Sequence, residues 1–376
     1  MSFARLPRVV SAVGVVALLG SLAVSAHAIT IDLVPVGNAG NANDPATGSV
    51  YGGVAYDYQI GKYDVTIGQY TDFLNAVAAT DTYSLYNASM ATDLNVAGIA
   101  QTGSSGSYTY SVIAPSGTTP AGASSPGNRP ITYVSWWDSA RFSNWMANGQ
   151  PTGAQTSTTT ENGAYNLANW TSGTAPAKNV TNPNTSAPPS FFIPNENEWY
   201  KAAYYSPTLN SGSGGYYACA TQSSTDPGNV VGSGANQANY NTGSGFSVTQ
   251  SSSYDSNQNY LTDVGAFSGS GSFYGTFDQS GTVYQWNDLD GAAGSSRGLR
   301  GGNWKAGSAF NLSSSFSNSV DPSLENNVIG FRLASPVSGP SGVPEIDPAM
   351  GSSALSLVAG VLAMIEQRRR RVALVA

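Results

Sequence analysis

Apolar residues recur at helical spacing in two stretches of the chain. Residues 66–77 (TIGQYTDFLNAV) place large apolar side chains at i, i+3, i+6, i+7 and i+10, on one face of a helix. Thr66 precedes the pattern and is a favourable N-cap residue. Residues 135–147 (SWWDSARFSNWMA) predict a second helix, in which Ser135 is the N-cap and Asp138 its capping-box partner three positions later.

The remaining patterns are shorter. A third helix is predicted over 196–203, and short strands are predicted over 55–62, 131–134, 299–304 and 330–334. Between them lie stretches rich in Gly, Ser, Thr and Pro, which indicate surface loops at 102–128, 148–160 and 170–190. The pattern predicts one compact, loop-rich α+β domain.

The N-terminal residues 1–28 have the pattern of a secretory signal peptide. Arg5 and Arg8 precede an apolar run over 9–24, and Ala26-His27-Ala28 suits a signal peptidase. A membrane-anchoring helix is the alternative, but the run is shorter than the ~20 residues that span a bilayer. We expect cleavage after Ala28 and export of the mature chain.

The C-terminal residues 338–376 are also patterned. Pro-Glu-Ile-Asp-Pro at 344–348 precedes an apolar stretch over 349–365 and then four arginines at 368–371. An ordinary C-terminal membrane anchor is one interpretation. The order of the three parts resembles the PEP-CTERM sorting tail. That resemblance implies an exosortase-type sorting enzyme as a partner, transient or lasting membrane association, and a final location at the envelope surface or outside the cell.

Composition narrows the chemistry of the region between these ends, residues 29–337. The only histidine is His27, inside the predicted signal peptide. Its loss leaves the mature chain without imidazole, which excludes Ser-His-Asp and Cys-His nucleophilic sites and histidine-ligated zinc or iron.

Charge and cysteine content further limit the possible partners and chemistry of the chain. The chain carries 22 acidic and 15 basic residues, a formal net charge of −7 at pH 7. An acidic surface repels phosphate backbones, which argues against nucleic acid as a partner. Cys219 is the only cysteine, so no intrachain disulfide forms. Its apolar neighbours favour an inert buried thiol, although a dimer link or a reactive thiol stays open.

Four blocks resemble, in order, the sulfatase-modifying-factor (formylglycine-generating enzyme) family. They are Ile60–Thr66 (IGKYDVT), Arg129–Trp136 (RPITYVSW), Ile193–Trp199 (IPNENEW) and the stretch from Tyr274 through Arg300-Gly301-Gly302-Asn303-Trp304 to Gly330-Phe331-Arg332. The resemblance implies a single formylglycine-generating-enzyme fold, related to the C-type lectin fold, over residues 29–337.

The catalytic residues of that family are missing. Its enzymes use a copper-binding cysteine pair shortly after the Gly-Gly turn, and the matching positions here are Ala306 and Asn311. Neither side chain is a thiolate that could hold Cu(I). The departure argues against copper and against formylglycine generation.

The resemblance also implies structural calcium. Its ligands would be side-chain oxygens of Asp278 and Gln285 with carbonyls of Gly281 and Val283, and a second site would start at Asn239 and Tyr240. These are hard oxygen donors, as calcium prefers. Gln285 stands where the family has a carboxylate, which lowers the charge of the first site. The alternative is that these polar turns are hydrogen-bonded loops.

Other charged residues are better explained by structure. Glu196 and Glu198 fall on different faces of a helix, so an opposed acid/base pair is disfavoured. Asp64 and Asp138 are interpreted as turn or capping groups. Arg300 and Arg332 are expected in buried ion pairs or hydrogen-bond networks.

The leading hypothesis is a non-catalytic surface binding module. In relatives of this fold the loops near the C-terminal end carry ligand specificity, here residues 306–327. We expect Asn311 to hydrogen-bond a glycan, with Trp304 or Phe316 stacking beneath it, and an extracellular polysaccharide as the partner. The alternatives are a formylglycine-generating-type oxidoreductase that acts on sulfatase cysteines, and a matrix protein without a discrete ligand pocket.

Overall fold

The computed structural model describes residues 28–120 and 123–337. The predicted signal peptide, apart from Ala28, and the predicted sorting tail lie outside the described residues. The helices are α1 (Ile67–Val77), α2 (Ser89–Thr92), α3 (Trp136–Ala147), α4 (Glu196–Tyr204) and α5 (Leu209–Gly212), with 3-10 turns η1 (Pro45–Thr47), η2 (Pro126–Asn128) and η3 (Ala309–Leu312). The strands are β1 (Leu33–Val36), β2 (Tyr58–Gly61), β3 (Ile99–Thr102), β4 (Thr109–Val112), β5 (Tyr205–Ser206), β6 (Gly215–Tyr216), β7 (Tyr284–Asn287), β8 (Arg297–Arg300), β9 (Asn318–Val320), β10 (Ile329–Gly330) and β11 (Ala334–Pro336).

The three predicted helices are confirmed, together with the predicted caps. The Thr66 hydroxyl accepts a hydrogen bond from the backbone N–H of Gln69, and the Thr66 N–H donates to the Gln69 side chain, which gives a complete capping box at the start of α1. Ser135 and Asp138 form the same arrangement at the start of α3. Capping boxes satisfy backbone donors that the first helical turn leaves free, so these local sequences fix where the helices begin.

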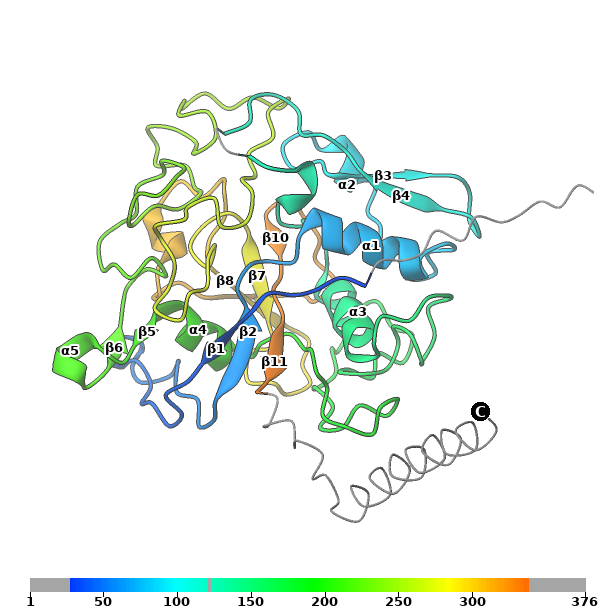
Figure 1. Ribbon diagram of the computed structural model, residues 1–376, viewed down its shortest axis with the longest axis horizontal. Helices are drawn as coiled ribbons and strands as arrows, with labels where there is room; N and C mark the ends of the chain where they lie inside the picture. The colour runs from blue at the N-terminus through cyan, green and yellow to red at the C-terminus, as the bar shows by residue number, and fades with distance from the viewer. Residues whose placement is uncertain (1–27, 121–122, 338–376) are drawn as a thin grey trace, which may run out of the picture.

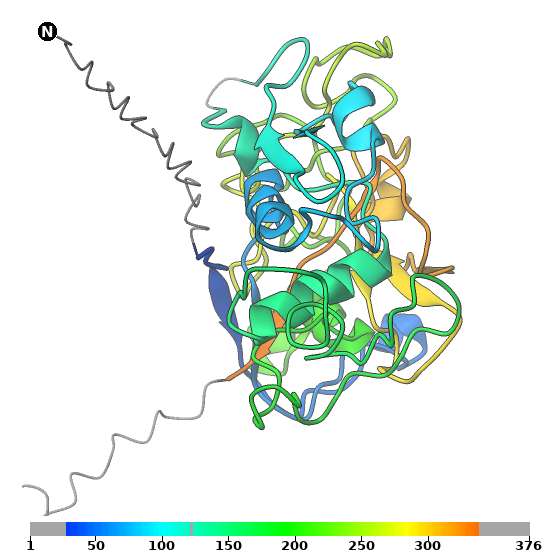
Figure 2. The same cartoon turned by 90° about the vertical axis from the view of Figure 1, so that its right-hand side faces the viewer.

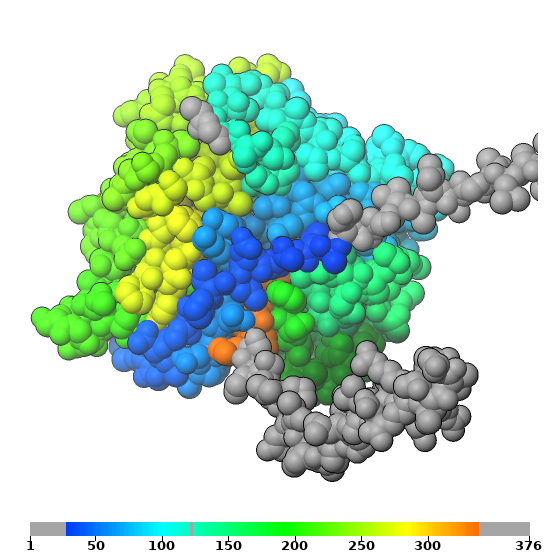
Figure 3. Space-filling view, viewed as in Figure 1, coloured from blue at the N-terminus to red at the C-terminus, as the bar shows by residue number. Residues whose placement is uncertain are grey.

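Two small sheets form the centre of the molecule (Figure 1). In one, β2 lies between β1 and β11 and pairs antiparallel with both. In the other the order is β10-β7-β8-β9, with β10 parallel to β7 and the remaining pairs antiparallel. The mixed, strand-poor architecture matches the predicted α+β class. Strand β1 lies at the surface beside the segment around Tyr274 (Figure 3), whose hydroxyl donates to the carbonyl of Gly37 at 3.2 Å.

The strand predictions were less accurate. Residues 131–134 form no strand, because Tyr133 adopts φ +58° and the segment bends. The predicted strand at 299–304 is β8, which ends at Arg300 because Gly301 and Gly302 turn with φ +101° and +76°. The predicted strand at 330–334 is split between β10 and β11. The loop expected at 102–128 contains the β4 strand of a hairpin.

The main core lies between the central sheets and the pair α1 and α3. Phe142 of α3 contacts Phe73 of α1 edge-on at 5.2 Å and Phe331 at 5.3 Å. The long connection after α3 runs around that helix (Figure 2), and Asn144 holds it there by donating to the carbonyls of Thr160 and Tyr165. Among residues 28–120 and 123–337, no helix has the length and apolar character needed to cross a membrane.

Buried ion pairs connect distant segments of the chain. Arg300 and Arg332 take part in them, as expected. Asp64 is different from the expectation, since it is buried against Arg332 at 3.0 Å rather than capping a turn. The described pairs are Arg141–Glu161, Arg297–Asp288, Arg300–Glu196 and Arg332–Asp64.

Candidate functional site

Strand β7 separates two different environments. Side chains alternate between the two sides of a strand, so Tyr284 and Gln285 point in opposite directions. Gln285 is fully buried, whereas Tyr284 is partly exposed. Asp278, which is predicted to bind calcium, contacts Gln285, and Asn311 and Phe316, which are predicted to bind a glycan, contact Tyr284.

The amide of Gln285 has no atom left for a ligand. Its Oε1 accepts from Trp199 Nε1 at 2.7 Å and from Arg332 Nε at 2.6 Å. Its Nε2 donates to the carbonyl oxygen of Asp278 at 2.9 Å. Arg332 is held in turn by Asp64. Gln285 therefore joins four segments of the chain through internal hydrogen bonds.

The other residues of the predicted first calcium site also make contacts within the protein. Asp278 Oδ2 accepts from the backbone of Gly265 at 2.7 Å, and burial raises the pKa of Asp278 to about 6. The amide of Gly281 donates to the Gly301 carbonyl at 2.6 Å. The Val283 side chain packs in a buried apolar cluster.

The second predicted site lies directly beside the first. The carbonyl of Asn239 accepts from the Thr282 amide at 2.8 Å, and its Nδ2 donates to the Tyr260 carbonyl at 3.1 Å. The hydroxyl of Tyr240 donates to the carbonyl of Pro227. The structure thus places the two predicted sites side by side, and polar atoms of Asp278, Gln285, Asn239 and Tyr240 are used in hydrogen bonds within the protein.

One predicted ligand atom, Gln285 Oε1, is unfavourably placed for a calcium ion. Calcium takes six to eight oxygen ligands, whereas the central oxygen here, Gln285 Oε1, already accepts two donors and touches the guanidinium of Arg332. Within the described parts of the chain, no group of three or more His, Cys, Asp or Glu side chains is arranged to hold a metal. The alternative interpretation of these turns as hydrogen-bonded loops accounts for the contacts.

Of the two positions that match the family's cysteines, Ala306 precedes η3 and Asn311 lies within it. Ala306 is buried in a small apolar cluster with Leu312. Cys219 is far away in sequence, but its backbone forms an isolated antiparallel β-bridge with that of Ser313, so it lies close to this region. Its side chain is buried, and burial raises the pKa of the thiol to about 11. A thiol with that pKa stays protonated at neutral pH, which agrees with the inert interpretation.

On the outer side of β7, three aromatic rings gather around an amide. Tyr284 stacks on Phe316 at 5.8 Å, and Phe310 meets Phe316 edge-on at 5.8 Å. Asn311 Nδ2 donates to the Tyr284 hydroxyl at 3.3 Å. Phe310 is 59% exposed. We call these four residues the aromatic patch.

The patch is held in place from beneath by a buried cation. Arg300 donates from Nη1 to the carbonyls of Ser314 and Phe316, at 3.2 and 2.7 Å, and its Nε contacts Glu196 at 2.7 Å. The turn at Gly302 brings η3 against β8, since a Cβ at Gly302 would come within 2.6 Å of the Leu312 side chain. The aromatic patch therefore rests on a preformed support.

Of the three residues predicted to contact a glycan, two lie in the patch and one does not. Asn311 and Phe316 are partly exposed members of it. Trp304 is only 1% exposed, its ring is stacked on Tyr260 at 4.9 Å, and its Nε1 donates to the Asn327 carbonyl. This corrects the expectation for Trp304, which has no free face for a sugar ring.

Sequence reasoning missed Tyr284 and Phe310. Tyr284 stands inside the stretch that was assigned to calcium, and Phe310 stands next to Asn311 in the loop that was expected to bind the ligand. Alternation along β7 could have separated Tyr284 from Gln285.

Comparison with known protein families matches residues 33–337 to the sulfatase-modifying factor enzyme 1-like domain. The chain belongs to this family. The match covers the region that the four sequence blocks mark, and it includes both sides of β7 as well as the positions of Ala306 and Asn311.

Solved structures are also similar to this sulfatase-modifying-factor-like chain. Treponema denticola variable protein 1 is 16% identical with a TM-score of 0.43, over 83% of this chain and 97% of that chain. CarF is 19% identical with a TM-score of 0.43, over 82% and 99%. PvdO from Pseudomonas aeruginosa is 17% identical with a TM-score of 0.37, over 75% and 82%. The comparison with curated proteins gave no match.

Proposed function

We propose that this protein is a non-catalytic member of its family that binds a glycan through the aromatic patch. One observation carries the proposal: the rings of Tyr284, Phe310 and Phe316 meet around Asn311, at a position where the family's enzymes have a cysteine. With alanine and asparagine at the two cysteine positions, these positions provide no thiolate pair for copper.

The chemistry of the patch suits a sugar. Aromatic rings give broad apolar faces with a polar edge, and a pyranose ring presents an apolar C–H face to such a ring. The Asn311 side-chain amide donates one N–H to the Tyr284 hydroxyl, so its carbonyl oxygen and its second N–H can form hydrogen bonds with sugar hydroxyls. The net charge of −7 favours a neutral polysaccharide over a polyanionic one.

We also propose that the protein acts outside the cell. The signal-peptide pattern at 1–28 and the sorting-tail pattern at 338–376 support export, processing by an exosortase-type enzyme and display at the envelope surface. Fractionation of cells that produce the whole chain, with and without residues 368–371, tests this part. Equal amounts at the surface and in the medium for both forms would contradict a role for the tail.

A glycan array tests the binding proposal. Protein from expression of the whole chain is applied with calcium and with EDTA, beside the double variant Phe310→Ala, Phe316→Ala. The expected result is binding to one class of neutral glycan that the double variant loses and that EDTA leaves unchanged. Phe273→Ala is the matched control, because Phe273 is a partly exposed ring on another part of the surface.

Other outcomes lead to different conclusions. Equal binding by wild type and double variant would move the site away from the patch. No binding to any glycan would favour the matrix protein. Mass spectrometry of a sulfatase-derived cysteine peptide, incubated with the protein, copper and oxygen, tests the oxidoreductase alternative. Formylglycine in that peptide would overturn the non-catalytic assignment.

A further inference from the structure

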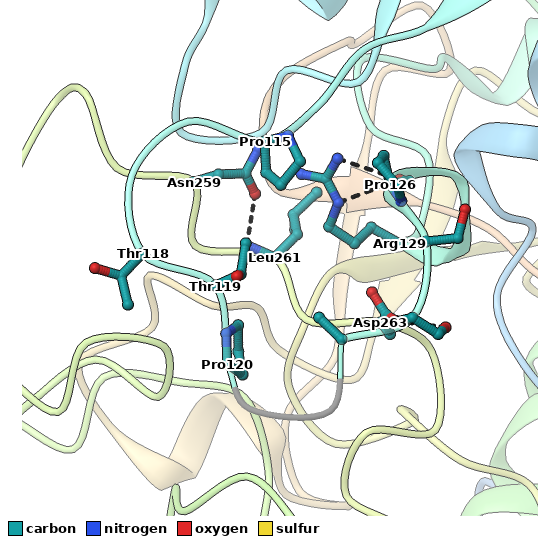
Figure 4. A pocket seen from close by; sticks show the side chains of 12 residues that line it. Pro115, Thr118, Thr119, Pro120, Pro126, Arg129, Asn259, Leu261 and Asp263 are labelled. Atoms are coloured by element: carbon teal, nitrogen blue, oxygen red, sulfur yellow. Dashed lines mark hydrogen bonds between the residues drawn. The ribbon is translucent and has the colours of Figure 1, made fainter.

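A small cavity lies away from the aromatic patch. It has a volume of about 200 Å³ and lies between the segment around η2 and residues 259–263 (Figure 4). Hydrogen bonds fix both of its walls. Gln258 pairs with the backbone of Thr118 in both directions, at 2.8 and 2.7 Å, and the amide of Val264 donates to the carbonyl of Asn128 at 2.9 Å.

Arg129 gives this cavity a buried positive charge. Its side chain lines the cavity, and the residue is 2% exposed. Nε and Nη2 both donate to the carbonyl of Pro126, at 3.2 and 3.1 Å, whereas Nη1 is buried without a hydrogen-bond partner in the described structure. Figure 4 shows the guanidinium held at Pro126 on one side and facing Pro115 on the other. Buried donors are usually paired. Arg141, Arg297 and Arg300 also have one unpaired guanidinium nitrogen each, but the one on Arg129 belongs to a side chain that lines this cavity, where an acceptor could reach it.

Arg129 differs from the other buried arginines of the described chain. Arg141, Arg297, Arg300 and Arg332 each have a carboxylate within 4.0 Å, and no such contact is found for Arg129 among the described residues. Burial lowers the pKa of Arg129 to about 10, so the guanidinium stays charged at neutral pH. Asp263 attracts this charge from beyond 4.0 Å and partly opposes the effect of burial on the pKa. A buried charge without a close partner is costly, and an anion beside Arg129 would offset that cost.

The rest of the lining limits the size and character of the anion. Pro115, Pro120 and Leu261 supply apolar walls. The Asn259 side chain is already satisfied by the Leu261 amide and the Ala97 carbonyl. At about 200 Å³ the cavity is smaller than the ~300–1,000 Å³ of a typical ligand pocket. It therefore has room for one small group with an apolar body.

Asp263 excludes a highly charged ligand. It lines the same cavity, and its Oδ2 accepts from the amide and the hydroxyl of Ser124 at 2.7 and 3.0 Å. A dianion such as phosphate would meet this carboxylate and the apolar walls. A single carboxylate directed at Arg129 avoids most of that repulsion.

We propose that this cavity binds a small aliphatic monocarboxylate, with the carboxylate accepting a hydrogen bond from Arg129 Nη1 and the aliphatic body against Pro115, Pro120 and Leu261. The site is separate from the aromatic patch and does not depend on the proposed glycan function. Free carboxylic acids and free amino acids share this chemistry.

Calorimetric titration of the whole chain tests the proposal. The probes are 4-methylpentanoate, its neutral amide 4-methylpentanamide, and leucine, which adds an ammonium group. We expect saturable binding of 4-methylpentanoate and at least tenfold weaker binding of the amide. Leucine binding as tightly as 4-methylpentanoate would indicate an amino acid as the source, and weaker binding a free carboxylic acid. Equal affinity for carboxylate and amide, or no binding of any probe, would overturn the proposal.

Three variants separate loss of the site from loss of the fold. Arg129→Met is expected to weaken carboxylate binding at least tenfold. Thr119→Trp should block the cavity without removing the charge, and Thr171→Trp, at another exposed threonine, is its matched control. Asp263→Asn removes a repulsive charge and should strengthen 4-methylpentanoate binding by roughly threefold, a gain that unfolding cannot mimic. Unchanged binding by Arg129→Met, or weaker binding by Asp263→Asn, would contradict the assignment.

Discussion

The two sides of β7 use similar residue types for opposite purposes. On the inner side, the Gln285 amide makes three hydrogen bonds to Trp199, Arg332 and Asp278. On the outer side, the Asn311 amide makes one long bond to Tyr284 beside an exposed ring of Phe310. The polar atoms of the Gln285 amide are used within the protein, whereas the Asn311 amide still has polar atoms that can bind a ligand.

The difference follows from the burial of each amide. Buried polar atoms must be paired, so once Arg332 and Trp199 reach Gln285, that residue acts as a structural link. Polar atoms at a partly exposed surface are satisfied by water and can exchange that water for a ligand. We therefore expect changes on the inner side to alter stability, and changes on the outer side to alter binding.

Arg332→Met should have the largest effect on stability. It leaves Asp64 buried without its partner and removes a donor from Gln285. Breaking a buried ion pair costs about 3–5 kcal/mol, which chemical denaturation would measure as a lower free energy of unfolding. Lys305→Met, at an exposed position, should change little. A loss below about 1 kcal/mol would show that the inner side is not a tightly coupled network.

The helices could be predicted from sequence because their signals are local. The capping boxes at Thr66 and Ser135 lie within three residues of their partners. The predicted strands at 55–62 and 299–304 overlap β2 and β8. Strand β10 could not be predicted as a separate strand, because it joins β7 over only two residues and from a distant part of the chain. A segment such as 131–134 has a strand-like composition, but its bend at Tyr133 depends on tertiary contacts, including the bond from its amide to the Asn326 carbonyl.

The candidate site also contains residues that could be predicted from sequence and residues that could not. Asn311 and Phe316 were found because the family resemblance placed the ligand in their loop. The internal role of Gln285 could not be found, since Arg332 and Trp199 lie 47 and 86 positions away in the chain. The burial of Trp304 follows from the double-glycine turn before it, whose direction no local pattern gives.

Asp278→Asn tests the inner side through pH. Burial raises the pKa of Asp278 from 3.8 to about 6 in the folded chain. Between about pH 4 and 6 the unfolded chain has therefore lost this proton while the folded chain keeps it, so the free energy of unfolding falls as pH rises. Asparagine removes this contribution, on the order of 3 kcal/mol.

The measurement for Asp278 is a difference between two curves. Burial also raises the pKa of Asp288 to about 6 and of Asp138 to about 7, so the wild type keeps other titrating groups. Denaturation of wild type and Asp278→Asn from pH 4 to 7 isolates the single contribution. Parallel curves would mean that Asp278 has an ordinary pKa and an open environment.

Phe310→Ala tests the outer side. The ring is 59% exposed, so its removal should change the free energy of unfolding by no more than about 0.5 kcal/mol. Glycan affinity should fall about tenfold, equivalent to about 1.4 kcal/mol. Denaturation and glycan titration of the same preparation make the comparison. A large loss of stability with unchanged affinity would reverse the assignment of the two sides.

Calcium should have the smallest effect, and Gln285→Glu sharpens that expectation. Glutamate restores the carboxylate that the family has at this position, but Trp199 and Arg332 would still donate to it. A cation would then compete with a fixed guanidinium for the same oxygen. We expect millimolar calcium to leave the thermal midpoints of wild type and Gln285→Glu unchanged. Ligand binding to the folded state raises its stability. If calcium stabilises only the variant, the wild-type site lacks a negative charge, and the inner side of β7 can open to admit the ion. If calcium stabilises both proteins, the hydrogen bonds around Gln285 rearrange to admit the ion.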